Sequence, residues 1–327
     1  MSTLSHLTLI DELKAKVHAC LSEFFTGAPF ALVDFPNIRN VGDSAIWLGE
    51  IAYLTHQHAT RPSYVSEMRD FSAAALNARV PEGPIFIHGG GNFGDIWLGH
   101  QNFREQILKT WPGRPVIQFP QSIHYSSQAR AEETARVIAA HGNFTLLVRD
   151  EESLQFATKH FACRTLLCPD MALCIGAFEP PRAEIPVLAM LREDREKASP
   201  HDLSAFPGIP VEDWITEPFL PVRLAKVRGL ARGLATLDPA QVRLGKFNAA
   251  ARQRFARGIR QIGRGRVIVT DRLHVHILSL LQNKPHAVLD NSYGKIARFM
   301  AAFSGRTDLS YRASSLSDAI AWARAHN

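Results

Sequence analysis

The chain has 327 residues, 46% hydrophobic and 21% charged, which is the composition of a globular protein with apolar material for two domains. No apolar run approaches the ~20 residues that cross a bilayer, and residues 1–11 are too polar for a secretory signal, so we expect a cytoplasmic protein. The four cysteines are then expected as reduced thiols, and their spacing matches no zinc motif, so no metal is predicted.

Short apolar runs alternate with longer amphipathic segments through the first half of the chain. An amphipathic helix is expected first, at residues 8–24. The sequence then predicts five strands, at 30–34, 85–88, 115–119, 145–148 and 165–168. Helices are expected between and after them, at 44–54, 101–110, 128–140 and 151–159. This alternation indicates βαβ units around a parallel sheet.

Three prolines within residues 178–186 interrupt the alternation, and we interpret this segment as a linker. A strand at 187–191 restarts the pattern, followed by a polar, proline-rich insert and an Arg/Ala-rich helical region. Two strands, at 267–270 and 286–289, and a helix at 316–325 complete the chain. We expect an α/β fold of two Rossmann-like domains, residues 1–182 and 183–327, with parallel sheets facing across a cleft. The final helix either belongs to the second domain or packs back on the first.

The segment from His88 to Asp95 contains three glycines spaced as G-x-G-x-x-G, directly after a predicted strand. A dinucleotide site would also need an acidic residue at the end of the next strand, but that strand leads into Pro120-Gln121-Ser122. The pattern therefore argues against NAD. What remains is a glycine turn at a helix N-terminus, where backbone N–H groups either approach a ligand or only permit a tight turn.

Polar residues follow several other predicted strands. Asn40 and Asp43 follow the first strand, Arg149 ends the fourth and Asp170 the fifth. Asn40 is suited to capping a helix, whereas the Asp43 carboxylate can instead accept protons from sugar hydroxyls. Because the carboxyl ends of parallel strands meet at one edge of a sheet, these groups indicate a wall that faces a ligand.

The two late strands bring cations and an imidazole to a second edge. The run at 267–270 stops at Asp271-Arg272, with His274 two residues on, and the strand at 286–289 leads toward Lys295. This combination suits a small, doubly anionic substrate. Competing interpretations are an ion pair of Arg272 with Asp271 or Asp290, and a surface position for Lys295. His276 lies on another face of the same helix and is interpreted as a core histidine.

Basic residues concentrate between Arg223 and Arg266, in a chain whose net charge is +6. The segment is interpreted either as a solvated helical face or as a surface for an anionic carrier lipid or membrane. Only Phe247 and Phe255 interleave the basic residues between Arg223 and Arg266, so nucleic acid is not expected as a partner.

Taken in order, the motifs of this chain resemble those of the polysaccharide pyruvyl transferase family. They are N-x-G-D (40–43), H-G-G-G-N-F-G-D (88–95), F-P-Q-S (119–122), V-R-D-x-x-S (148–153), D-M-A-L (170–173), L-R-x-D-x-E (191–196), T-D-R-L-H-x-H (270–276) and D-N-S-Y-G-K (290–295). The resemblance implies a glycosyltransferase-B-like fold. It also implies transfer of the pyruvyl group of phosphoenolpyruvate onto two hydroxyls of one sugar, which forms a pyruvate ketal and releases phosphate.

The resemblance also implies roles for individual residues. The R-x-H pair of the family corresponds to Arg272 and His274, in phosphoenolpyruvate binding and catalysis, and two further cations correspond to Arg149 and Lys295. Our hypothesis is that Arg272 and Arg149 clamp the two anionic groups of phosphoenolpyruvate while Lys295 adds charge where phosphate leaves. His274 would act as the acid and base. Residues expected on the acceptor side, where Asp43 or Asp95 would orient or deprotonate the sugar, are Asn40, Asp43, Gly90, Asn92, Asp95 and Gln121.

The expected partners are therefore phosphoenolpyruvate, as a co-substrate without any cofactor, and a saccharide of an exopolysaccharide or its lipid-linked precursor. A lipid-linked acceptor would place the protein at the inner face of the cytoplasmic membrane. Two other functions stay open at this point. One is a nucleotide-sugar-dependent glycosyltransferase of the same fold, and the other is a non-catalytic saccharide-binding component of a polysaccharide assembly complex.

Overall fold

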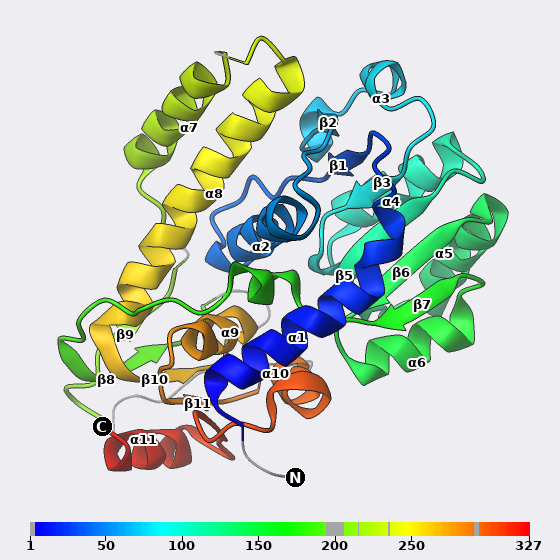
Figure 1. The fold of residues 1–327 in the computed structure, drawn as a ribbon. Helices are drawn as coiled ribbons and strands as arrows, with labels where there is room; N and C mark the ends of the chain where they lie inside the picture. The colour runs from blue at the N-terminus through cyan, green and yellow to red at the C-terminus, as the bar shows by residue number, and fades with distance from the viewer. Residues whose placement is uncertain (1–3, 194–205, 215, 235, 291–293) are drawn as a thin grey trace.

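The computed structural model of the chain describes residues 4–193, 206–214, 216–234, 236–290 and 294–327 (Figure 1). The described part contains two sheets, and every paired strand in both is parallel. The predicted α/β class with parallel sheets is confirmed. The last part of the L-R-x-D-x-E motif and the middle of D-N-S-Y-G-K lie outside the described residues.

The first sheet has the strand order β2-β1-β3-β5-β6-β7, and β4 pairs beside β5. Its strands are β1 (Ala31–Val33), β2 (Tyr64–Val65), β3 (Ile85–Ile87), β4 (Gly90–Gly94), β5 (Val116–His124), β6 (Phe144–Val148) and β7 (Arg164–Leu167). Side chains alternate between the two faces, as the period of a strand requires, and both faces are apolar. The sheet is therefore buried on both sides.

Helices cover the two faces of the first sheet. One face packs against α1 (His6–Leu21) and α2 (Val41–His58), and the other against α3 (Ala73–Arg79), α4 (Leu98–Thr110) and α5 (Gln128–His141). Helix α6 (Glu151–His160) packs near β5 and β7. Short helical turns complete this part, at η1 (Ser22–Phe24), η2 (Met68–Asp70) and η3 (Met171–Ile175). Several helices begin at a side-chain cap: the Asp150 carboxylate, for example, accepts from the Ser153 N–H at 2.8 Å.

The second sheet has the order β12-β11-β10-β8-β9. Its strands are β8 (Ile185–Met190), β9 (Val211–Glu212), β10 (Gly265–Thr270), β11 (His286–Val288) and β12 (Ser310–Arg312). The helices of this half are α7 (Phe219–Leu234), α8 (Pro239–Arg264), α9 (Leu273–Leu281), α10 (Lys295–Phe299), η4 (Met300–Ser304) and α11 (Leu316–Ala325). Helix α11 packs on the second sheet and not on the first, with Ile320 against Val267 and Val269.

A single apolar core joins the two halves. Helices α2 and α8 pack against each other between the two sheets (Figure 1), and the rings of Phe35 and Phe247 stack with centroids 4.2 Å apart. The indole N–H of Trp47 in α2 donates to Asn248 Oδ1 in α8 at 2.8 Å. All strands of the first sheet precede residue 168 and all those of the second follow residue 184, so the two sheets use separate parts of the chain around a shared helical layer.

The structure differs from the sequence prediction in three places. The glycine run does not open a helix: residues Gly90–Gly94 form strand β4, with φ of 134° at Gly90 and 124° at Gly94, and α4 begins only at Leu98. The basic helical region is an antiparallel pair, α7 and α8, rather than one segment. The short strands β2, β9 and β12 were not predicted, because two or three residues carry no visible alternation. In the described part, no helix combines the length and hydropathy that a membrane span requires.

Candidate functional site

The core of the candidate site is a buried carboxylate that contacts residues from both halves of the chain. Asp170 follows β7, and its Oδ2 lies 2.5 Å from Arg149 Nη1 and 3.5 Å from His274 Nε2. Burial opposes ionisation of Asp170, but the contact with His274 and the charge of Arg149 outweigh it and lower the pKa of this carboxyl. Asp170 therefore stays charged and connects a cation of the first half to the imidazole of the second.

Arg149 is fixed by a second contact, because its Nε donates to the Ser122 hydroxyl at 3.0 Å. The remaining nitrogen, Nη2, points toward strand β4. An ideal Cβ built on Gly91 would lie 3.1 Å from Arg149 Nη2 and 3.4 Å from Lys295 Nζ. Lys295 begins α10 and is buried, so it is not the surface lysine of the competing interpretation. The two cations converge over a glycine whose missing side chain leaves space between them.

His274 is held between α9 and the start of α2. An ideal Cβ on Gly42 would lie 2.3 Å from its Nδ1, so only glycine allows α2 to approach the ring this closely. The other nitrogen, Nε2, makes no hydrogen bond of ordinary length in the described part of the protein, since Asp170 is 3.5 Å away. Nε2 is therefore a buried nitrogen beside the Asp170 carboxylate, and its hydrogen-bonding capacity is not used within the described residues.

Arg272 is the N-cap residue of α9, the helix that carries His274. Its guanidinium contacts residues outside this helix. Its Nη2 lies 2.6 Å from Asp213 Oδ2, and its guanidinium carbon lies 5.7 Å from the centroid of the Trp214 ring. The expected ion-pair partners were wrong for this contact: Asp271 accepts from the Arg192 N–H at 2.8 Å, and Asp290 from the Ile296 N–H at 3.2 Å. An ion pair does exist, but with a residue that follows β9.

His276 lies in the protein core, as predicted. It is fully buried and hydrogen-bonded to His286 Nε2 at 2.7 Å and to the Ser304 hydroxyl at 2.8 Å. Burial, reinforced by the neighbouring His286, holds the pKa of His276 well below its usual value. The ring is therefore neutral and packed.

Most of the residues expected on the acceptor side make internal hydrogen bonds. Asn40 caps α2 by accepting from the Gly42 N–H at 2.9 Å. Asn92 Oδ1 accepts from Arg104 at 2.9 Å and from Gln121 Nε2 at 3.0 Å. Asp95 accepts from the backbone N–H groups of residues 126 and 127 at 2.7–3.0 Å. The side-chain oxygens of these residues therefore already accept hydrogen bonds from within the protein.

Asp43 is different. It lies half-buried in the first turn of α2, and its Oδ1 would be 3.6 Å from an ideal Cβ on Gly90. Within the described ranges the Asp43 side chain has no hydrogen bond or ion pair. It is therefore the carboxylate best placed to accept a proton from a bound hydroxyl.

Two histidine–carboxylate pairs that sequence reasoning missed lie close to Asp43. The His100 Nδ1 contacts both Asp34 oxygens at 2.9–3.0 Å, and Asp34 adopts a left-handed backbone, with φ of 69°. The His88 Nδ1 lies 2.9 Å from Glu50 Oε2. Burial disfavours the charged His88 ring, but Glu50 outweighs this and raises the pKa of His88, and Asp43 and Asp34 act in the same direction. Only the position of Asp34 directly after a strand could have indicated this from sequence.

Metal ligands are not grouped in this region. In the part of the chain that the structure describes, no three His, Cys, Asp or Glu side chains are arranged to hold a metal ion. On one side the candidate site is instead composed of Arg149, Lys295 and the His274 imidazole, with Arg272 at the start of the helix that carries His274. Asp43 and the two histidine pairs form its other side. Such a set binds anions and transfers protons.

Comparisons with known proteins agree with this description. The family model for polysaccharide pyruvyl transferase matches residues 40–293. "Pyruvyl transferase 1" of Schizosaccharomyces pombe is 32% identical over 283 residues, which cover 82% of this chain and 68% of that protein. The EpsO protein of Bacillus subtilis is 29% identical over 297 residues, 88% of this chain and 89% of its own.

A crystal structure of a functionally uncharacterised protein from Klebsiella pneumoniae superposes with a TM-score of 0.58 at 19% identity, covering 93% of this chain and 99% of that one. This likeness concerns the fold. The family match extends from the start of α2 to the segment before α10, and it includes Asp43, Arg149, Asp170, Arg272 and His274. The chain therefore belongs to the polysaccharide pyruvyl transferase family.

Proposed function

We propose that the protein transfers the pyruvyl group of phosphoenolpyruvate onto two hydroxyls of one sugar, forming a cyclic ketal and releasing phosphate. One observation carries the proposal: Arg149 Nη2 and Lys295 Nζ both lie close to Gly91. Arg149 also contacts the Asp170 carboxylate, which lies 3.5 Å from His274 Nε2. The family membership supports pyruvyl transfer, and the anion-binding geometry supports phosphoenolpyruvate as the donor.

The donor has two anionic groups on one enol carbon, and the site offers two sets of cations for them. Arg149 and Lys295 would hold one group over Gly91. Arg272, oriented by Asp213 and Trp214, would hold the other. A guanidinium suits this role because its planar fork binds carboxylate or phosphate through paired hydrogen bonds.

The reaction then requires two additions at the same carbon. A proton adds to the methylene carbon of phosphoenolpyruvate while the first sugar hydroxyl bonds to C2. The second hydroxyl bonds to C2 as the C2–O bond to phosphate breaks, and its proton leaves to a base or to the phosphate. His274 Nε2 would deliver the first proton, and Asp43 would accept one from the sugar. Two such hydroxyls on one sugar give a ketal ring. Positioning and charge supply the remaining rate enhancement.

The acceptor is proposed to be a sugar of an exopolysaccharide or of its lipid-linked precursor. On this view it binds between Asp43 and the Asp34–His100 pair, whose His100 ring is 23% exposed. A carboxylate and a carboxylate-bound imidazole are suited to hydrogen-bonding neighbouring sugar hydroxyls. The acceptor would then meet the donor across the space between Gly90 and His274.

The decisive experiment incubates the protein with phosphoenolpyruvate and candidate saccharides, and follows phosphate release together with acceptor mass. We expect His274→Ala and Arg149→Lys to lower turnover by ~100-fold or more while the fold is retained. The first variant loses an acid–base group, and the second loses a guanidinium that bonds Asp170 and Ser122 while one nitrogen remains for the donor. His56→Ala and Arg136→Lys, at exposed positions, are matched controls. Near-wild-type phosphate release by both site variants would refute the assignment, and stabilisation by nucleotide sugars but not by phosphoenolpyruvate would favour a glycosyltransferase.

A further inference from the structure

The helical pair α7–α8 projects from the edge of the molecule, and α7 packs on α8 through its smallest residues (Figure 1). An ideal Cβ on Gly229 would lie 2.4 Å from the Gly245 carbonyl oxygen, and one on Gly233 would lie 2.5 Å from Val242 Cα. This G-x-x-x-G spacing lets the two backbones approach closely. The face of α7 that contacts the protein is therefore its glycine face.

The large apolar residues of α7 lie on the opposite face. Six residues in and just after α7, which we call the leucine stripe, are 41–92% exposed: Leu220, Leu224, Val227, Leu230, Leu234 and Leu237. They recur every three or four residues and so form one continuous strip along the helix. Among the described residues, eleven large hydrophobic side chains are exposed, and these six are the majority. A helix that buries glycines and exposes leucines presents an interaction surface.

The charge around the stripe indicates what covers it. Residues 219–264 contain eleven Lys and Arg residues and one acidic residue, Asp238, a formal charge of +10. The whole chain carries +6, so the rest of the protein is net −4. Helix α7 itself contains four basic residues and no acidic one. A strip of leucines flanked by basic residues is the pattern of a helix that lies in the interface of an anionic membrane.

We propose that α7 lies on an anionic lipid bilayer, with the leucine stripe inserted at the boundary of head groups and acyl chains. A second copy of the chain fits this surface less well, because pairing two such faces would bring two sets of like charges together. The rest of the protein, at net −4, would be repelled by the same bilayer. The anionic bilayer would therefore attract the helical pair and repel the rest of the protein, which orients the molecule with α7 toward the membrane.

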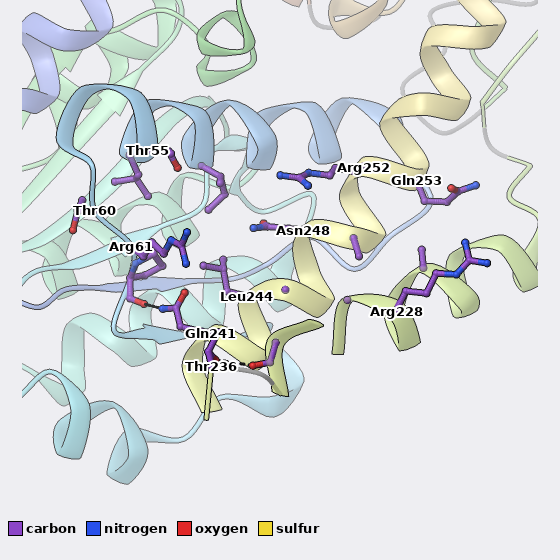
Figure 2. A pocket seen from close by; sticks show the side chains of 18 residues that line it. Thr55, Thr60, Arg61, Arg228, Thr236, Gln241, Leu244, Asn248, Arg252 and Gln253 are labelled. Carbon is purple, nitrogen blue, oxygen red and sulfur yellow. Dashed lines mark hydrogen bonds between the residues drawn. The ribbon is translucent and has the colours of Figure 1, made fainter. Parts of the chain in front are cut away.

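A cavity lies on the glycine face of α7, on the side of the helix away from the stripe. It has a volume of about 560 Å³, and its walls come from the end of α2, the following loop, α7 and α8. Arg61, Arg228 and Arg252 line it, and Figure 2 shows Arg61 and Arg252 extending into the space between α2 and α8, whereas Arg228 extends along α7. Among the described residues, neither a carboxylate nor any candidate site residue lines the cavity. Its arginines add to the basic character of the helical pair.

The helical pair also contacts residues 37–39, the segment directly before α2. Lys226 donates to Asn37 Oδ1 at 2.9 Å, and Arg257 donates to the Arg39 carbonyl at 2.7 Å. Residues 37–39 lead directly into α2, which begins beside Asn40 and carries Asp43. A bilayer under α7 would therefore lie next to the route by which a lipid-linked sugar reaches Asp43. The membrane contact itself does not depend on the chemistry proposed above.

Vesicle co-sedimentation of the full chain tests this proposal. We expect the protein to bind vesicles of phosphatidylcholine mixed with phosphatidylglycerol at low salt, to be released at high salt, and not to bind pure phosphatidylcholine. Leu224→Ser/Val227→Ser and, separately, Arg228→Gln/Arg252→Gln should each weaken binding on the order of tenfold or more. In Val227→Trp, the emission of the new indole should shift to the blue on addition of the mixed vesicles.

Matched substitutions at exposed positions elsewhere, Leu7→Ser and Arg136→Gln/Lys159→Gln, should leave binding unchanged. Thermal unfolding of each variant checks that the fold is retained. Absence of binding to the mixed vesicles at low salt would overturn the proposal, as would binding that the α7 variants do not weaken. A dimer in solution that Leu224→Ser/Val227→Ser dissociates would instead assign the stripe to a second copy, and would also overturn it.

Discussion

At the scale of single residues, one oxygen atom connects the two halves of the candidate site. Asp170 Oδ2 contacts both Arg149 and His274, so the position of the imidazole depends on a carboxylate from the other half of the chain. Because this carboxylate is charged and buried, replacing it by an amide removes the opposite charge of Arg149 and the orienting contact of His274 together. The two functional residues are thus coupled, and changes at either are not expected to be additive.

The close contact between Gly42 and the His274 ring gives a prediction at this scale. Gly42→Ala would place a methyl group 2.3 Å from His274 Nδ1, so the ring must move. We expect kcat to fall on the order of 100-fold, because a displacement of about 1 Å misaligns the proton transfer. We also expect stability to fall by about 1–3 kcal/mol, because the added methyl group overpacks the contact. Ser44→Ala, on the same helix, removes a buried hydroxyl and should preserve kcat. Equal activity of Gly42→Ala and the wild type would show that the position of His274 does not limit the rate.

The residues of the site could be read from the sequence, but their partners could not. Arg149, Asp170, Arg272 and His274 follow predicted strands, and the edge of a parallel sheet brings such positions together. Asp213, by contrast, is 59 residues from Arg272, and Asp34 is 66 residues from His100. These contacts depend on how distant segments of the chain pack and on side-chain rotamers. No local sequence pattern predicts either of them.

At the scale of elements, α9 and β11 share a buried histidine pair. His276 and His286 are both fully buried and 2.7 Å apart, and burial lowers the pKa of His286 to about 4. Between about pH 6.5 and about pH 4 the unfolded chain therefore binds protons that the folded protein does not. Stability present at neutral pH is lost as the pH falls through this window.

We accordingly expect the free energy of unfolding to decrease by roughly 1.4 kcal/mol per pH unit for each titrating histidine within that window. Urea unfolding at a series of pH values measures this slope. His286→Gln should flatten it, and His56→Gln, at an exposed position, should not. A stability that stays constant while the pH is lowered through the window would contradict the neutral, buried state of the pair.

Element types were largely predictable and their details were not. The β-branched run before Thr270 and the buried run before His88 both gave correct strands, because a buried parallel strand is continuously apolar. The glycine run was expected as a turn and is strand β4, because its backbone pairs with β5 despite a low intrinsic preference for strands. The division of the basic region into α7 and α8 depends on the turn near Asp238, which caps α8.

At the scale of the whole molecule, the shared helical layer determines how the protein unfolds. Trp47 and Phe35 of the first half pack against Phe247 and Asn248 of the second, within one continuous core. We expect one cooperative calorimetric transition, with calorimetric and van't Hoff enthalpies equal. Two separable transitions, or an independently folded fragment of residues 1–182, would show instead that the predicted domain boundary divides two autonomous units.

The placement of α1 has a consequence for how the chain is assembled during synthesis. This helix precedes every other element, yet it packs against η3 and α9, Leu4 donates to the Arg306 carbonyl, and Glu12 pairs with the Arg306 side chain. The first sheet and η3 are complete by residue 175, whereas α9 and Arg306 follow only at residues 273–281 and 306. The apolar face of α1 is therefore able to pack on the first half of the chain before its contacts with the second half exist. Helix α1 thus completes its contacts in two steps, and the second step joins the two halves after both have been synthesised.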